Sequence, residues 1–308
     1  VYRYHENGRD YYALGNDAVY PFPCDEEENN RLDIFHTLIH DIALNGAMHN
    51  AQLSQHQAVS ILDVGHGTGI WVYEMAQRAR NANVVGIDLY SRTPRRETAI
   101  SNASFLTPVD FRHPQWPFEP DSHHLIRMSQ LCGCVSDWHA LYLTASRYIR
   151  PGNGYIEHVE FDWTPRCFDG HVFPPHAAPL AQWWDAMQRA SHRAGRPMAL
   201  PEDVESLLAR CGFADTMHRT VRIPLQRRDH DRRDWDLYWA FKTAMSLRLE
   251  DGRAPQAFES LSMSLFTRHL RFPPDTVAAW CNALRAVFEH TATPLYFNLH
   301  VWTARKPR

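Results

Sequence analysis

The sequence predicts a doubly wound α/β fold, in which helices cover both faces of an open, mostly parallel sheet. Between residues 58 and 164, apolar runs of strand length alternate with helical patterns, as they do in parallel βαβ units. The first apolar run leads directly into three closely spaced glycines, Gly65, Gly67 and Gly69. A glycine-rich turn after the first strand is where sheets of this kind bind ligands. We therefore expect residues 58–164 to form a ligand-binding half.

Strands in this half are predicted from mainly apolar runs, because a parallel strand is buried on both faces. Helices are predicted where apolar residues recur every three to four positions. The predicted strands cover residues 58–64, 83–89, 103–110, 123–130 and 150–165, and the predicted helices cover residues 70–80 and 137–149.

The regular alternation ends after this half. Residues 165–200 and 226–294 read as helical insertions. Their aromatic side chains indicate helices packed on the sheet, a lid over the acceptor pocket, or a surface that docks a partner protein. Residues 201–225 and 295–308 each contain a strand pattern and are expected to complete the sheet. Residues 1–57 form a cap that includes an N-terminal helical segment. We expect one catalytic domain over residues 1–308.

The overall composition excludes several classes of protein. The chain has 308 residues, 44% of them hydrophobic, and a net charge of −3, so we expect a globular core and no direct nucleic-acid binding. Two short basic clusters at residues 92–97 and 226–234 are interpreted as solvent-exposed surface. No apolar run has the roughly 18 residues that a membrane span requires.

The cysteines predict neither a metal site nor a disulfide framework. Of the six cysteines, only Cys132 and Cys134 are close in sequence, and their spacing matches neither a zinc site nor a redox pair. Reduced thiols are typical of the nucleus or cytoplasm, where we expect the protein to act. Because the chain opens at Val1 rather than Met, we expect the natural protein to extend further at its N-terminus.

The glycine loop points to a particular kind of ligand. A dinucleotide loop would place its third glycine at position 70, which is Ile70 here. Asp63, two residues before Gly65, would repel a pyrophosphate. The loop therefore disfavours a nicotinamide-dependent oxidoreductase and favours S-adenosylmethionine, which carries an amino group and a sulfonium but no phosphate.

Two further acids end the next predicted strands. Asp88 is placed where a carboxylate accepts hydrogen bonds from both ribose hydroxyls, and we assign the adjacent Leu89 to the same site. Asp110 and Phe111 would meet the adenine, the acid at its amine and the ring by stacking. Together with Asp63 and the three glycines, these residues predict an S-adenosylmethionine site.

The chain also resembles a known family. The segments "ILDVGHGTGIW", "GIDL", "IEHVEFDWTPRCFDG" and "NLHVWTARKP", with the N-terminal run over residues 2–36, are similar to the LaeA-like methyltransferases of filamentous fungi. The resemblance implies a class I, Rossmann-like methyltransferase with a seven-stranded sheet. It implies regulation of secondary metabolism and development, with a protein such as a histone, or a small molecule, as methyl acceptor. It also implies a velvet-type, zinc-finger or second methyltransferase partner.

Single residues are carried over from this resemblance. Tyr4, His5 and Tyr20 match the N-terminal family pattern and are assigned to the cofactor site. Arg127 and Ser129 stand where the family usually has His and Arg. Such departures leave the acceptor open, and they favour an alternative in which the fold is a scaffold subunit with little or no catalysis.

Catalysis of methyl transfer mainly requires alignment of donor and acceptor. A base is needed only where the acceptor must lose a proton. The candidates for contact with the acceptor are His36, Arg127, Glu157 and His158. Glu157 and His158 are neighbours on one predicted strand, so only one of them can face the cleft.

Overall fold

The computed structural model describes residues 2–13, 20–54, 57–89, 100–168, 173–227, 232–246, 257–289 and 295–308. The basic cluster at residues 92–97 lies outside this part of the chain, as does the middle of the cluster at 226–234. All six cysteines lie within it, and each is a free thiol. None of the helices in these ranges is long and apolar enough to cross a membrane.

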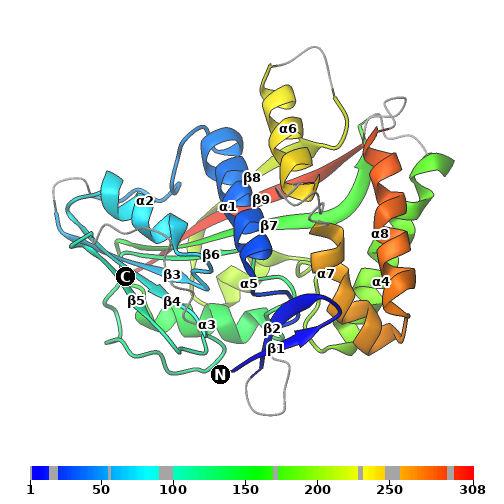
Figure 1. The fold of residues 1–308 in the computed structure, drawn as a ribbon. Helices are drawn as coiled ribbons and strands as arrows, with labels where there is room; N and C mark the ends of the chain where they lie inside the picture. The colour runs from blue at the N-terminus through cyan, green and yellow to red at the C-terminus, as the bar shows by residue number, and fades with distance from the viewer. Residues whose placement is uncertain are drawn as a thin grey trace.

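A seven-stranded sheet forms the centre of the molecule (Figure 1), with the strand order β5-β4-β3-β6-β7-β9-β8. Neighbours from β5 to β7 run parallel, and β9 runs antiparallel to both β7 and β8. The strands are β3 (Val59–Val64), β4 (Ala82–Ile87), β5 (Ala103–Leu106), β6 (Leu125–Ser129), β7 (Gly154–Cys167), β8 (Ala214–Pro224) and β9 (Leu295–Lys306). The predicted doubly wound, mostly parallel sheet is confirmed.

The helices lie on both faces of this sheet and beyond one end of it. They are α1 (Glu26–Thr37), the π-helical η1 (Leu38–Ala43), α2 (Ile70–Arg78), α3 (Trp138–Tyr148), the short η2 (Pro175–Ala177), α4 (Ala178–Arg193), α5 (Val204–Arg210), α6 (Arg232–Ser246), α7 (Ala257–Leu265), the π-helical η3 (Phe266–Leu270) and α8 (Pro274–Glu289). Helices α4, α7 and α8 pack on one another and stand together at one end of the molecule (Figure 1).

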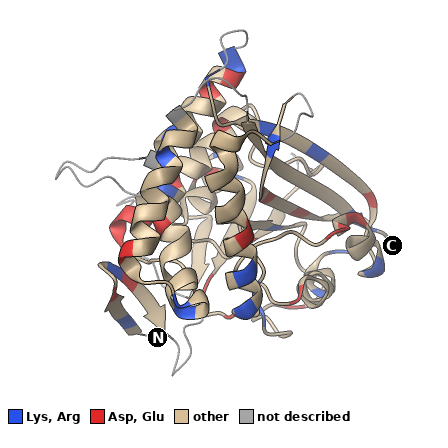
Figure 2. Cartoon of the chain, turned by 90° about the vertical axis from the view of Figure 1, so that its right-hand side faces the viewer, with Lys and Arg blue, Asp and Glu red and all other residues tan. Residues whose placement is uncertain are grey.

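Charged residues of both signs are interspersed on the side of the molecule that carries α4 and α8 (Figure 2). Within the inserted helices, the aromatic residues Trp183 and Phe241 are fully buried, whereas Trp239 is exposed. Phe241 contacts Phe35 of α1 and Phe297 of β9. These buried rings attach the insertions to the sheet, which is one of the predicted roles.

The N-terminal segment contains the expected helix α1. Asp25 caps its N-terminus, because the Asp25 side chain accepts a hydrogen bond from the backbone N–H of Glu28. Before it comes a hairpin that the sequence analysis did not predict. Strands β1 (Tyr2–Glu6) and β2 (Arg9–Ala13) pair around an Asn-Gly turn, in which both turn residues have positive φ. Asn-Gly is the preferred dipeptide of such two-residue turns.

Candidate functional site

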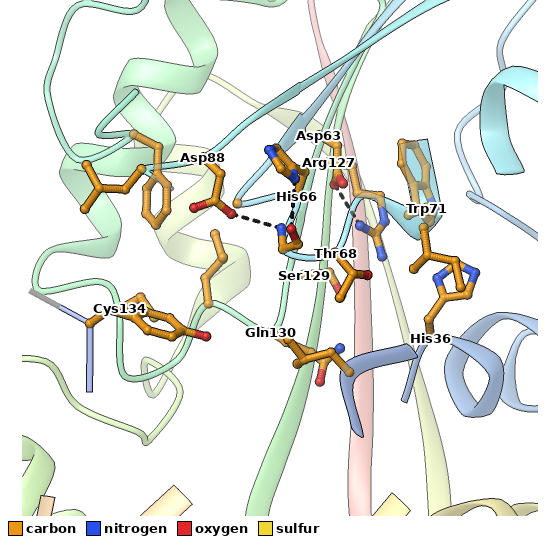
Figure 3. Close-up of a pocket in the computed structure, with 18 of the residues that line it drawn as sticks. His36, Asp63, His66, Thr68, Trp71, Asp88, Arg127, Ser129, Gln130 and Cys134 are labelled. Carbon is orange, nitrogen blue, oxygen red and sulfur yellow. Dashed lines mark hydrogen bonds and ion pairs between the residues drawn. The ribbon is translucent and has the colours of Figure 1, made fainter. Parts of the chain in front are cut away.

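A cavity of about 1000 Å³, including its open mouth, lies at the carboxyl ends of the parallel strands. Asp63 reaches it from β3, Asp88 from the end of β4 and Asp110 from the loop after β5. Ser129 and Gln130 reach it from the end of β6 (Figure 3). The chain order of the strands reverses between β3 and β6, so the cavity occupies the switch point at which doubly wound sheets bind ligands.

The three glycines of the loop have different surroundings: two line the cavity and one lies against the protein core. Gly67 has a φ of +57°, and a Cβ added there would meet no atom within 4 Å, so its backbone is open to the cavity. Gly65 also lines the cavity. Gly69 does not: it begins α2 in the left-handed conformation, and an added Cβ would lie 2.8 Å from the Phe105 ring. The structure therefore brings two of the three predicted glycines to the site.

Asp88 holds the glycine loop against the end of β4. Its Oδ2 accepts a hydrogen bond of 2.9 Å from the backbone N–H of Gly67 (Figure 3). Leu89, which the sequence also assigned to the site, lines the cavity beside Asp88. A carboxylate in this position has the acceptor geometry that ribose hydroxyls require.

Asp63 is not a free negative charge. Arg127 Nη1 donates to its Oδ1 at 2.8 Å, and the guanidinium carbon of Arg127 lies 4.5 Å from the centre of the Trp71 ring. Burial raises the pKa of Asp63, and Arg127 opposes that shift. The acid that the sequence set against a pyrophosphate is therefore paired with a cation of the protein itself. The pair suits a zwitterion, with a carboxylate toward Arg127 and an ammonium toward Asp63.

His40 completes this buried group. Arg127 Nη2 lies 3.0 Å from His40 Nε2, and His40 Nδ1 lies 2.9 Å from the carbonyl oxygen of Ala47. A carbonyl can only accept, so Nδ1 carries the proton and Nε2 accepts from Arg127. Burial, followed by the charge of Arg127, holds the pKa of His40 well below its usual value. The imidazole is therefore neutral at physiological pH.

Three buried polar atoms on residues that line the cavity have no hydrogen-bond partner in the described structure: Arg127 Nε, Ser129 Oγ and His66 Nε2. Buried polar atoms are normally satisfied, so these three are unusual. The open backbone of Gly67, the Asp88 carboxylate and the Asp63–Arg127 pair carry the hydrogen-bonding groups that the sugar and amino-acid end of S-adenosylmethionine require, so the residues present fit this cofactor.

The predicted adenine partners also line the cavity. Asp110 accepts two hydrogen bonds from the Arg112 guanidinium, at 2.8 and 2.6 Å. Burial raises the pKa of Asp110, but the hydrogen bonds from Arg112 outweigh it and leave the pKa below its usual value. The ring of Phe111 lies beside them, so a carboxylate and a stacking surface are present as expected.

Two N-terminal residues assigned to the site lie elsewhere. Tyr4 and His5 belong to β1 and are not among the residues that line the cavity. Tyr4 receives a hydrogen bond from Arg268, and His5 Nδ1 lies 2.8 Å from Asp10 Oδ1. The hairpin directs Tyr4 toward η3, which the sequence pattern did not reveal. Tyr20, by contrast, lines the cavity.

Glu157 and His158 also lie outside the cavity lining. They occupy opposite faces of β7, and both are fully buried. Glu157 accepts the backbone N–H of Asn50 at 2.6 Å, and His158 Nδ1 lies 2.8 Å from the hydroxyl of Tyr142. Neither faces the cleft, because this part of β7 is covered by protein on both sides.

His36 lines the cavity and lies 3.2 Å from Glu74, from its Nε2 to the carboxylate Oε2. His40 and Trp71 are among the cavity residues that were not predicted. His40 follows His36 by about one helical turn, and Trp71 lies in the first turn of α2 after the glycine loop, so their spacing was a usable signal. Within the described ranges, no group of His, Cys, Asp or Glu is arranged to hold a metal ion.

Comparisons with known proteins agree with this geometry. Residues 32–218 match the family model described as a methyltransferase domain, and the chain is therefore an S-adenosylmethionine-dependent methyltransferase, as the sequence predicted. Geranyl diphosphate C-methyltransferase from Streptomyces coelicolor A3(2) shares the fold, with a TM-score of 0.50 at 14% identity over 98% of this chain and 92% of that one.

Relatives with higher sequence identity identify the family within that class. The chain is 34% identical to the secondary metabolism regulator LAE1 of Cochliobolus heterostrophus, over 99% of this chain and 95% of that protein. It is 31% identical to the protein-methionine methyltransferase laeA of Emericella nidulans, over 98% and 76%. The chain belongs to the LaeA family of secondary metabolism regulators. The predicted family is confirmed; which single residues contact the cofactor stays a prediction.

Proposed function

We propose that this protein transfers the methyl group of S-adenosylmethionine to a methionine side chain of a protein acceptor, and so regulates secondary metabolism in a fungus. The observation that carries the proposal is the meeting of Asp63, Asp88 and Asp110, from three successive strands, around one cavity. The choice of acceptor is supported by the relative whose name specifies protein methionine.

The residues of the cavity have distinct tasks in this account. Asp88 and the Gly67 backbone bind the ribose, and Asp110 with Phe111 receives the adenine. Asp63 and Arg127 bind the amino-acid end and fix the orientation of the donor. S-adenosylmethionine supplies a methyl group that its own sulfonium activates, so alignment is the main contribution left to the protein.

The absence of a predicted general base is consistent with a methionine acceptor. A thioether has no proton to lose, so its methylation needs no base. His36, the candidate base that does line the cavity, is already paired with Glu74. The alternative of a scaffold subunit without catalysis rests on the departures at Arg127 and Ser129, and both residues line the cofactor cavity.

Two further parts of the proposal rest on the family alone. We propose that the protein acts in the nucleus or the cytoplasm, and that a regulatory protein such as a velvet-type, zinc-finger or second methyltransferase partner presents the acceptor. Pull-down of the tagged chain from fungal extract, with partners identified by mass spectrometry, tests this part.

Methyl transfer itself is tested with methyl-labelled S-adenosylmethionine, the purified chain and a fungal protein extract. We expect label in proteins, and fragment spectra that assign it to S-methylmethionine. The control is Asp88→Ala, which should lose both. Label confined to lysine, arginine or small molecules would contradict the methionine acceptor while leaving the methyltransferase class intact.

A further inference from the structure

A second, smaller cavity of about 410 Å³ adjoins the cofactor cavity. We call it the acceptor chamber; it lies between Tyr20, Gln130, Glu160 and Trp163. Three residues, Tyr20, Leu32 and Gln130, line both cavities, so the two cavities share a wall. Even with its opening to solvent counted, the volume of the acceptor chamber is less than half that of the cofactor cavity, so it suits one amino-acid side chain rather than a second large ligand.

The walls of the acceptor chamber are mostly aromatic and apolar. Tyr20 and Phe22 meet edge to face at 5.4 Å between ring centres. Phe161 and Trp163 stack at 5.4 Å, and Met198 and Leu261 add apolar side chains to the lining. Aromatic faces attract a cation that has been separated from water, and they also accept an apolar thioether.

One buried carboxylate faces this aromatic lining. Glu160 is 2% exposed, and its Oε2 accepts the backbone N–H groups of Leu131 at 2.7 Å and Cys132 at 3.1 Å. His158 Nε2 lies 3.5 Å from the same oxygen. Among the described residues, no Lys or Arg forms an ion pair with Glu160. Its carboxylate therefore lies against the chamber without a Lys or Arg partner in this part of the chain.

Arg31 is the basic residue that lines the acceptor chamber. Its charge is already matched, because Nε and Nη2 donate to the two carboxylate oxygens of Glu28 at 2.9 and 2.6 Å. Its guanidinium also lies 5.0 Å from the centre of the Phe35 ring. Arg31 and Glu28 together add no net charge, so Glu160 is the acidic residue of the chamber lining that has no Lys or Arg partner within the described ranges.

We propose that the acceptor chamber binds a methionine side chain and stabilises the sulfonium that forms on it. The inference rests on the proposed function. The acceptor sulfur uses a lone pair to bond the methyl carbon, the carbon–sulfur bond of the donor breaks toward the donor sulfur, and no proton is released. The positive charge thus passes into the chamber, where Glu160 and the aromatic walls meet it. Because the charge is greater on the product than on the substrate, these groups favour the transfer step.

Binding measurements test this without relying on turnover. N-acetylmethionine methylamide and its S-methyl sulfonium are titrated calorimetrically into the protein saturated with S-adenosylhomocysteine. We expect the sulfonium to bind at least about tenfold more tightly. In Glu160→Gln, whose amide oxygen can still accept the backbone N–H groups, the two affinities should become nearly equal.

A pair of matched variants checks the aromatic walls. Phe22→Leu removes a ring from the acceptor chamber and should weaken sulfonium binding several-fold. Phe272→Leu removes a ring that packs on Phe266 and Trp280, away from both cavities, and should leave sulfonium binding unchanged. Binding of S-adenosylhomocysteine and the melting temperature show that each variant is folded.

Three results would overturn the chamber assignment: no binding of either probe, equal affinities in the wild-type protein, or a sulfonium preference that survives Glu160→Gln. A different result would contradict the proposed function. If the wild-type protein labels no methionine in extract yet binds the sulfonium through Glu160, the acceptor class is wrong while the chamber still recognises a cation.

Discussion

Asp63 and Arg127 are register partners on adjacent parallel strands, β3 and β6, and they form a buried ion pair of 2.8 Å at the edge of the cofactor cavity. The pair neutralises charge that would otherwise be costly to bury. It also directs one acidic and one basic group to the same end of the site. The donor's amino-acid end, itself a zwitterion, fits this arrangement.

Removing one partner of this ion pair should destabilise the folded protein. Arg127→Met leaves Asp63 buried without its cation, and we expect a loss of about 3–5 kcal/mol in the free energy of unfolding. Affinity for S-adenosylhomocysteine should fall as well. Urea denaturation and calorimetry measure the two effects.

The double variant Asp63→Asn with Arg127→Met is the control for this prediction. Because it buries no charge, it should regain much of the stability but not the affinity. A cost below about 1 kcal/mol for Arg127→Met alone would show that the ion pair does not matter for folding.

The glycine loop allows a comparison of two neighbouring glycines. Gly67→Ala should cost about 1–2 kcal/mol, because its backbone is left-handed, and its new methyl group would stand in the cavity and reduce cofactor affinity at least about tenfold. Gly69→Ala should cost more stability, because the methyl group would press on Phe105.

Melting curves and S-adenosylhomocysteine titrations of both glycine variants test this. A larger affinity loss in Gly69→Ala than in Gly67→Ala would contradict the assignment of Gly67 as the residue that the ligand approaches.

Stability should depend on pH through a buried histidine distant from the cavity. Burial lowers the pKa of His123 from 6.5 to about 4. Because the unfolded chain takes up the proton first, stability is full above pH 6.5 and falls as the pH drops toward 4. The contribution of His123 to this loss is about 3 kcal/mol at pH 4.

His123→Gln carries no titrating group, so its free energy of unfolding should decline less between pH 6.5 and 4 than that of the wild-type protein. Urea denaturation at half-unit intervals measures the difference. Parallel curves for the two proteins would show that His123 is not responsible.

The parallel half of the fold could be predicted because its strands are buried on both faces and read as apolar runs. The same pattern predicted the glycines after β3 and the acidic residues after β4 and β5. The hairpin at the N-terminus was missed although its Asn7-Gly8 turn stands in the sequence. Its short strands do not alternate cleanly between polar and apolar residues.

Contacts that depend on strand order could not be predicted from the sequence. Arg127 meets Asp63 only because β6 lies beside β3, 64 residues away along the chain. The alternation rule correctly put Glu157 and His158 on opposite faces of β7. It did not predict that both faces are covered there, since that depends on Asn50 and Tyr142 from distant segments.

The central claim is that Asp88 and the glycine loop form an S-adenosylmethionine site, and calorimetric titration with S-adenosylhomocysteine tests it most directly. Wild-type protein should bind saturably with one site, Asp88→Ala should lose at least about tenfold in affinity, and Asp185→Ala on the exposed face of α4 should bind like wild type. Wild-type protein that fails to bind, or an Asp88→Ala variant that binds equally well, would contradict the account.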